Sequence, residues 1–128
     1  MILVDAGVLI DFLRTKDRKL NQLFRSLPVA VCGVTRAEIL AGARGARNRQ
    51  NLRRFLDRFQ QVGITERLWD LIGDTVAALA SRGLTVPFPD AVIATVGVEI
   101  DAEVWARDLH FPMMQRILPR LKLFQEPP

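Results

Sequence analysis

Four acidic residues stand beside short apolar runs, and their side chains are the ones in this chain best suited to chemistry. They are Asp5, Glu38, Asp90 and Asp108. Asp5, Glu38 and Asp108 follow the runs 2–4, 29–32 and 104–105, and Asp90 opens the run 91–94. If these runs lie side by side in a parallel sheet, the acids meet at one edge, where open α/β sheets bind their ligands.

Four carboxylates repel one another when they share a pocket. At separations of about 5 Å and an effective dielectric near 20, each pair repels by about 3 kcal/mol. The sum over all pairs exceeds a typical folding stability. A bound divalent cation removes this repulsion, and all-oxygen ligand sets suit Mg²⁺ or Mn²⁺. The pattern therefore indicates a metal site of the kind that hydrolyses phosphodiester bonds.

Each acid also has a purely structural interpretation. Asp5 and Asp108 are ordinary turn residues, and Asp90 is a good helix N-cap. Glu38 follows Thr35 at capping-box spacing, in which the glutamate would bind the backbone N–H of Thr35. For any one of these acids, the structural interpretation is at least as good as the metal-binding one. The joint placement of all four favours a metal site.

Three nearby residues extend the analysis. Asp11 lies on the first predicted helix and either supports the site acids or faces water. His110, two residues after Asp108, is predicted to be a hydrogen-bonding scaffold residue. The chain has one histidine and one cysteine, Cys32 in an apolar run, which argues against histidine-rich zinc sites and Cys/His nucleophiles.

Basic residues gather in the middle of the chain. The net charge is +4 and the pI is about 10.2, values that favour a polyanionic partner such as nucleic acid. The arginines of this stretch form either a phosphate-binding surface or a solvated helix face. They are Arg36, Arg44, Arg47, Arg49, Arg53, Arg54 and Arg58.

Hydrophobic periodicity predicts alternating strands and helices, and hence a mostly parallel sheet covered on both faces. The predicted strands are 1–5, 29–34, 62–64, 102–105 and 121–124. The predicted helices are 8–13, 20–27, 35 to about 42 or 45, 48–59, 66–82, 90 to about 97 or 98, and 113–118. Pro87 and Pro89 predict an extended segment before Asp90.

Length and composition place the chain in one domain, residues 1–128, with 125–128 as a loose tail. No apolar run approaches the roughly 18 residues that span a bilayer, and no secretory leader is recognisable. The unpaired Cys32 fits a reducing compartment. We expect a cytoplasmic, soluble protein without a membrane partner.

Four segments, taken in order, resemble the PIN-domain nucleases, and specifically the VapC-type ribonuclease toxins of toxin–antitoxin pairs. They are residues 4–11 (VDAGVLID), 35–42 (TRAEILAG), 90–94 (DAVIA) and 107–111 (RDLHF). The resemblance covers essentially the whole chain. It implies a three-layer αβα fold with a central sheet of 4–5 strands, and catalysis with Mg²⁺ or Mn²⁺ held by Asp5, Glu38, Asp90 and Asp108.

The resemblance also implies an RNA substrate, a homodimer, and a cognate antitoxin whose tail occupies a basic, apolar groove near the acids. Arg36, Arg44, Arg47, Arg53 and Arg54 are the candidates for the RNA or antitoxin groove. Two positions depart from the family, which commonly has a hydroxyl residue where this chain has Ala6 and Ala106. Loss of such hydroxyls typically weakens metal binding by about 10- to 100-fold.

Three alternatives stay open beside a toxin ribonuclease. One is a stand-alone RNA-processing nuclease, and another is a catalytically weakened module that binds RNA or protein. The third is a phosphotransfer enzyme or receiver domain. Gly7 disfavours it, because a haloacid-dehalogenase-like phosphatase would have a second aspartate at this position, two residues after the first.

Overall fold

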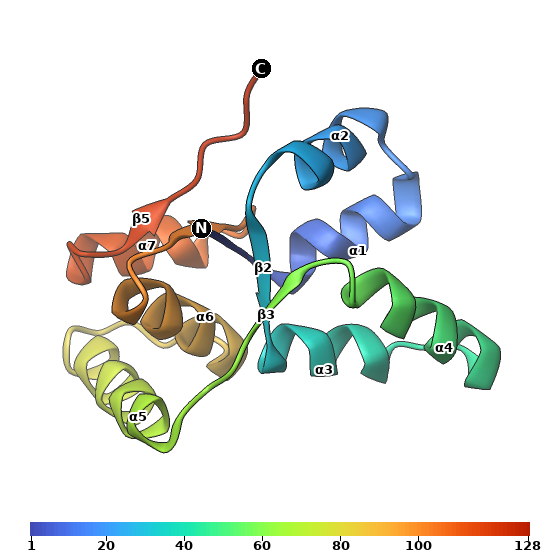
Figure 1. Cartoon of the computed structure of the whole chain (residues 1–128). Helices are drawn as coiled ribbons and strands as arrows, with labels where there is room; N and C mark the ends of the chain where they lie inside the picture. The colour runs from blue at the N-terminus through green and yellow to red at the C-terminus, as the bar shows by residue number, and fades with distance from the viewer.

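The computed structural model describes residues 1–128, and its strands form one fully parallel sheet (Figure 1). The strands are β1 (Ile2–Val4), β2 (Val29–Cys32), β3 (Gln60–Val62), β4 (Glu103–Trp105) and β5 (Lys122–Leu123), in the spatial order β3-β2-β1-β4-β5. The first strand of the chain is thus the central one, where Leu3 lies between Ala30 and Val104. Parallel neighbours require crossover connections, and helices supply them here.

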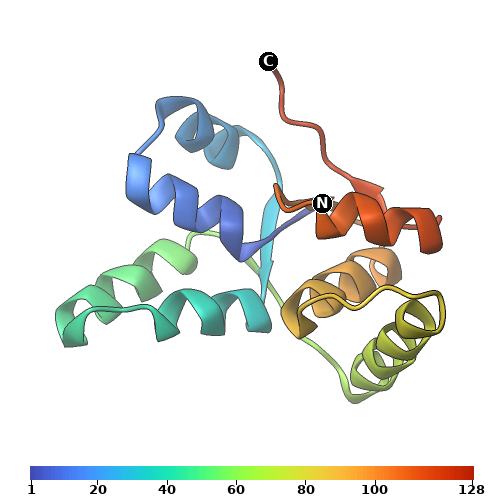
Figure 2. The same cartoon turned by 180° about the vertical axis from the view of Figure 1, so that it is seen from behind.

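Helices cover both faces of the sheet, which confirms the predicted three-layer αβα class. One layer holds α1 (Ala6–Thr15), α2 (Arg18–Ser26), α3 (Gly33–Ala41) and α4 (Gly45–Leu56), and the other holds α5 (Glu66–Ser81), α6 (Phe88–Glu99) and α7 (His110–Ile117). Figures 1 and 2 show the two layers on opposite sides of the strands. None of the helices is long and apolar enough to cross a membrane.

Alternation along the strands divides the apolar residues into two cores. Ile2 and Val4 of β1 point into one core with α1, α2 and α4, whereas Leu3 points into the other with α5, α6 and α7. This is the period of two that a strand imposes on its side chains. In the first core, Trp105 is fully buried and its ring lies 5.3 Å from that of Phe24.

Two of the predicted boundaries next to the acids are wrong. Strand β2 ends at Cys32 and α3 begins at Gly33, so Thr35 is a buried residue inside the helix. The capping-box interpretation of Thr35 and Glu38 therefore fails, and Glu38 lies on a helix rather than at a strand end. Helix α6 begins at Phe88, so the segment before Asp90 is already helical.

The remaining boundaries differ by a few residues. Helix α4 begins at Gly45 rather than at residue 48, β3 is 60–62 rather than 62–64, and α7 begins at His110. Helix α5 agrees closely with its prediction, because Thr65 caps it by accepting a hydrogen bond from the Leu68 backbone N–H at 3.2 Å. The tail that the sequence predicts to be loose is held at Glu126, which accepts hydrogen bonds from Trp105 and Arg107.

Candidate metal centre

Asp5 lies at the end of the central strand and begins α1. Its side chain caps the helix by accepting a hydrogen bond from the Gly7 backbone N–H at 3.3 Å. Asp5 therefore has the local structural role that its position in the sequence predicts, in addition to any role in the site. Its backbone N–H donates to the Trp105 carbonyl at 2.9 Å, which ties the end of β1 to β4. The residue is only 7% exposed. Burial is the main cause that raises the pKa of Asp5 to about 6, and the charges of Asp90 and Glu38 contribute to the rise.

Asp90 and Asp108 meet at His110. Asp90 lies in the first turn of α6 and Asp108 in the loop before α7. The His110 Nδ1 is 2.8 Å from the Asp90 Oδ2 and 2.9 Å from the Asp108 Oδ1. Asp108 also accepts a hydrogen bond from the His110 backbone N–H at 2.9 Å. Potential ligand atoms of these three residues all lie within 4.8 Å of one another.

Glu38 completes the acidic group from the side of α3. The pKa of Glu38 is raised by partial burial and by the negative charge of Asp90. The pKa of Asp90 is raised chiefly by burial and further by Asp108, while the hydrogen bond from His110 lowers it. The charge of each acid is therefore linked to at least one of the others: Asp90 raises the pKa of Asp5 and of Glu38, and Asp108 raises that of Asp90. Only Asp90, Asp108 and His110 form a compact ligand set.

This arrangement fits a hard divalent cation. Carboxylate oxygens are the ligands that Mg²⁺ and Mn²⁺ prefer, and the mutual repulsion of the acids is relieved when a cation lies among them. The carboxylates of Asp90 and Asp108 lie close together, and the pKa values of Asp5 and Glu38 are both raised by the charge of Asp90. Hydrophobic burial of Asp5 would strengthen its attraction to a cation, because the local dielectric is low.

His110 is the residue whose part the sequence analysis understated. The sequence predicts a scaffold residue, and its Nδ1 does contact both carboxylates, but His110 is also counted among the residues that could together hold a metal ion. The available signal was its position two residues after Asp108. Nothing local in the sequence connects it to Asp90, which is twenty residues away in the chain.

A groove of about 590 Å³ lies between α1, α3 and α4, and Glu38 is one of its lining residues. Apolar side chains line part of it, and three cations, Arg14, Lys16 and Arg44, lie along it. The lining residues are Ile10, Leu13, Arg14, Lys16, Glu38, Ile39, Gly42, Arg44, Asn48 and Leu52. Ile10 is 49% exposed, so an apolar group could contact it without displacing core residues.

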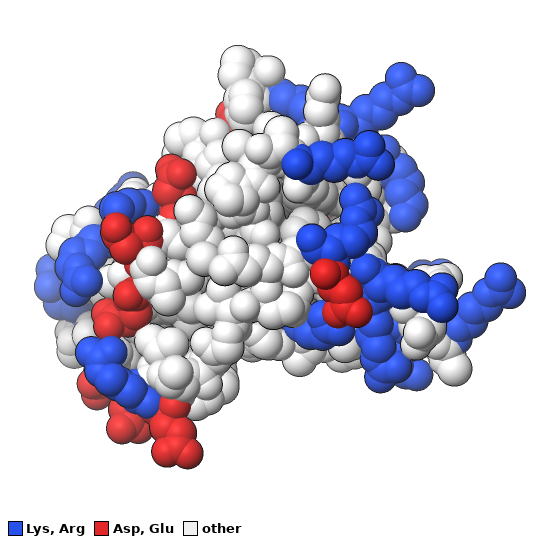
Figure 3. Space-filling model, in the orientation of Figure 1, with Lys and Arg blue, Asp and Glu red and all other residues white.

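The five candidate arginines occupy different environments. Arg44 lines the groove, and Arg47, Arg53 and Arg54 are exposed on α4 without ion pairs. Arg36 is engaged elsewhere, because its Nη2 lies 2.9 Å from the Asp57 carboxylate and its Nη1 donates to Gln61. Figure 3 shows mostly basic side chains over the α2–α4 side of the molecule, and acidic and basic side chains mixed over the α5–α6 side.

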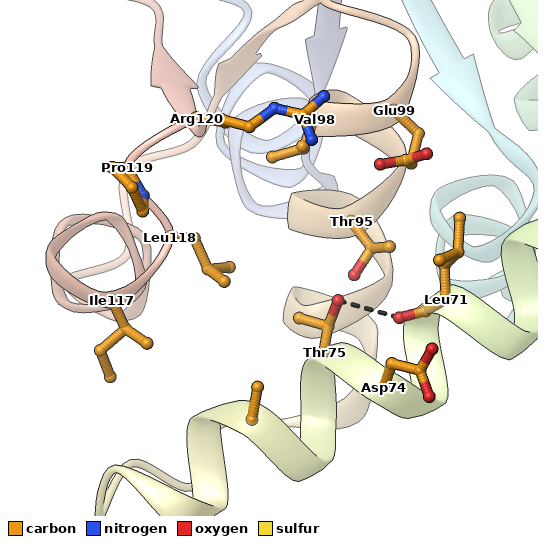
Figure 4. Close-up of a pocket in the computed structure, with 11 residues that line it drawn as sticks. Leu71, Asp74, Thr75, Thr95, Val98, Glu99, Ile117, Leu118, Pro119 and Arg120 are labelled. Carbon is orange, nitrogen blue, oxygen red and sulfur yellow. Dashed lines mark hydrogen bonds between the residues drawn. The ribbon is translucent and has the colours of Figure 1, made fainter.

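A second cavity of about 310 Å³ lies far along α6 from Asp90. It is open to solvent and is lined by α5, the second half of α6, the end of α7 and the segment that follows it, and Figure 4 shows its lining residues. Asp74, Glu99 and Arg120 are its charged members, and none of the four acids of the site lines it. The chemistry of the acids therefore belongs to the other end of α6.

Comparison with known proteins agrees with this geometry. The PIN domain model matches residues 2–116. No curated protein sequence matches the chain significantly. Among solved structures, DNA-bound VapBC from Salmonella typhimurium superposes with a TM-score of 0.83 at 19% identity, covering 96% of each chain.

Two further structures share the fold. VapBC2 from Rickettsia felis, bound to a promoter DNA fragment, has a TM-score of 0.80 at 17% identity and covers 97% of this chain and 98% of its own. VapC20 from Mycobacterium tuberculosis, described as a toxin that cleaves the sarcin–ricin loop, has a TM-score of 0.67 at 18% identity, covering 88% and 94%.

Proposed function

Because this chain belongs to the PIN domain family, we propose that it is a divalent-metal-dependent endoribonuclease and the toxin of a toxin–antitoxin pair. The observation that carries the proposal is the convergence of Asp90, Asp108 and His110 beside the buried Asp5. VapBC complexes and a sarcin–ricin loop cleaving toxin share its fold, and this supports the toxin assignment.

The residues have distinct parts in the proposed reaction. The four acids would hold Mg²⁺ or Mn²⁺, and such an ion, when bound, would supply an activated water and stabilise charge on the scissile phosphate. Asp5 and Asp90 are the proposed direct ligands, and Glu38 and Asp108 complete the cluster or orient the attacking water. His110 holds Asp90 and Asp108 at fixed separation through its Nδ1. No covalent intermediate is required.

The groove beside Glu38 is the proposed site for a cognate antitoxin tail or for RNA. Its apolar floor suits an antitoxin segment with apolar side chains, and Arg14, Lys16 and Arg44 suit acidic side chains or phosphates. The exposed Arg47, Arg53 and Arg54 extend the positive surface along α4. Arg36 is the weakest member of the proposed set, since Asp57 already neutralises it.

The first test is substitution of Asp90. Asp90→Asn keeps the size of the side chain and removes its charge, so we expect RNA cleavage to fall by at least about 100-fold, as loss of a metal ligand should cost more than loss of an outer-shell partner. Cleavage of RNA with Mg²⁺ or Mn²⁺ and without metal measures this effect. Asp74→Asn, in the cavity at the other end of α6, is the matched control and should cleave normally. Undiminished metal-dependent cleavage by Asp90→Asn would refute the assigned site.

A catalytically weakened binding module is the second candidate, and one observation favours it. Ala6 is buried beside Asp5, and Ala106 is half-buried in the loop that carries Asp108, so neither place supplies a hydroxyl. Calorimetry with Mn²⁺ separates the two candidates. Saturable binding that Asp5→Asn abolishes argues for a working site, whereas no binding by the wild-type protein favours the module.

The homodimer is a further part of the proposal. Trp69 and Val76 on α5 are 45% and 38% exposed, and association through such side chains would remove apolar surface from water. Light scattering coupled to size-exclusion chromatography measures the mass in solution. A mass of 14.4 kDa at all concentrations would contradict this part alone.

A further inference from the structure

Arg107 connects three parts of the chain that are distant in sequence. It precedes Asp108 in the loop between β4 and α7, and its Nη1 donates to the Asp11 carboxylate on α1 at 2.9 Å. Its Nε and Nη2 donate to the two carboxylate oxygens of Glu126, each at 2.8 Å. Such a two-pronged contact fixes orientation as well as distance, because the guanidinium and carboxylate planes must align.

Glu126 is itself anchored to the core. Its Oε2 also accepts a hydrogen bond from the Trp105 Nε1 at 3.0 Å, and the Trp105 side chain is fully buried. The Trp105 ring packs 4.8 Å from that of Phe124, which belongs to the same tail segment. The tail therefore presents a carboxylate to Arg107 from a fixed position, although it lies beyond the last strand.

Asp108 needs such a fixed neighbour. Its side chain is 51% exposed, and His110, two residues further on, is its only hydrogen-bonding partner. Residue 107 is the point at which the loop is tied both to α1, whose N-cap is Asp5, and to the tail. An arginine held from two sides limits where the next residue in the chain can place its carboxylate.

We propose that Glu126 and Asp11 are positioning residues that, by holding Arg107, fix Asp108 against Asp90 and Asp5 for metal binding. The inference rests on the proposed function and deepens it, because it assigns to the C-terminal tail a part in assembling the metal site. Exposed ion pairs contribute little to stability, and the side chains of Arg107 and Glu126 are 39% and 29% exposed. The effect belongs to the geometry of the site more than to the stability of the fold.

The test is Mn²⁺ binding by the full-length protein, measured by calorimetry. Glu126→Gln keeps the size of the side chain but cannot bind Arg107 through two charged oxygens, and Asp11→Asn weakens the other contact. We expect each to weaken Mn²⁺ binding by about 10-fold, the lower end of the range for residues that support metal ligands. Asp101→Asn is the matched control, because it removes an exposed ion pair with Lys122 at the other end of the sheet and should leave the affinity unchanged.

A double-mutant comparison identifies Arg107 as the intermediary. In an Arg107→Gln background, Glu126→Gln and Asp11→Asn should cause no further loss of Mn²⁺ affinity, because both act through the same guanidinium. Additive losses in that background would overturn the inference. In RNA cleavage, the single variants should lose activity at low Mn²⁺ and regain it at high Mn²⁺, whereas a general loss of folded protein would lower activity equally at every Mn²⁺ concentration.

Other outcomes are also decisive. Wild-type binding of Mn²⁺ together with unchanged affinity in both variants overturns this inference and leaves the proposed function standing. A rise in RNA affinity on Glu126→Gln would mean that the tail masks Arg107 from phosphates, and would likewise overturn it. Absence of Mn²⁺ binding by the wild-type protein would remove the proposed function and this inference with it.

Discussion

At the scale of single residues, Asp5 connects the stability of the fold with the chemistry of the site. Its pKa is raised to about 6 from an ordinary value of 3.8, mainly by burial. The folded protein therefore keeps a proton that the unfolded chain releases between these values. The free energy of unfolding of the metal-free protein should fall as the pH rises from about 4 to 6, and stay low above that, by on the order of 2–3 kcal/mol.

Asp5→Asn tests this relation. Asparagine caps helices as well as aspartate does, so at pH 8 in EDTA the variant should be more stable than the wild type by on the order of 2 kcal/mol, and at pH 4 nearly equal to it. Urea unfolding at both pH values measures the difference. Asp70→Asn, an exposed position on α5, should show no such pH-dependent gain. Equal stability of Asp5→Asn and wild type at pH 8 would contradict a strained carboxylate.

A site residue can be predicted from the sequence only when the pattern that marks it lies in neighbouring residues. Asp5 directly follows a strand-like run and Asp108 comes three residues after one, so both are recognisable in the sequence. The contacts of His110 with Asp90, and of Glu126 with Arg107, join residues about twenty positions apart. No local pattern encodes them, because the fold brings these side chains together.

At the scale of elements, the close approach of α6 to β4 depends on Gly97. A Cβ at this position would lie 2.5 Å from the Val104 Cγ2, well inside contact distance. Gly97→Ala should therefore lower the free energy of unfolding by about 1–3 kcal/mol, the usual cost of overpacking a core. Urea unfolding measures the loss. Because α6 carries Asp90 at its first turn, Mn²⁺ affinity should weaken as well.

Two variants sharpen this prediction. Gly73→Ala on α5 meets no atom within 4 Å, so it should stabilise the protein by roughly 0.5–1 kcal/mol through helix propensity. Adding Val104→Ala to Gly97→Ala removes the clashing methyl groups, and the double variant should lose less stability than the sum of the two single losses. Strictly additive losses would show that the contact is not the cause.

The boundaries of elements were least predictable where two local rules compete. Pro87 and Pro89 predicted an extended segment, yet Pro89 lies in the first turn of α6, where a missing N–H leaves no hydrogen bond unmade. Thr35 looked like an N-cap, but β2 is shorter than its apolar run suggests and α3 starts at Gly33. The buried strands β1 and β4 were predicted to within one residue at each end, because burial on both faces favours continuous apolar runs.

At the scale of the whole molecule, the gathering of basic side chains over α2–α4 predicts how the proposed RNA binding should respond to salt. Removing a cation that contacts phosphate lowers the slope of log affinity against log salt by about 0.7 for single strands. Arg47→Ala with Arg54→Ala should thus reduce the slope by about 1.4. Fluorescence anisotropy with single-stranded RNA at several salt concentrations measures it.

The control pair lies on the other layer of the molecule. Arg82→Ala with Arg116→Ala removes the same charge from the α5 and α7 side and should leave the slope unchanged. Equal reductions in both pairs would mean that RNA responds to net charge alone. The sequence could predict the positive charge of the stretch 36–58, but not that Asp57 would neutralise Arg36.

The central position of β1 has a consequence for synthesis of the chain. β1 has one of its two neighbours in residues 103–105, so during translation its edge toward β4 stays without a partner until those residues have emerged. Contacts between such remote segments form late and slowly. Asp108 and Glu126 belong to the same late part of the chain, so the proposed metal site cannot assemble on a nascent polypeptide until the residues that follow β4 have been synthesised.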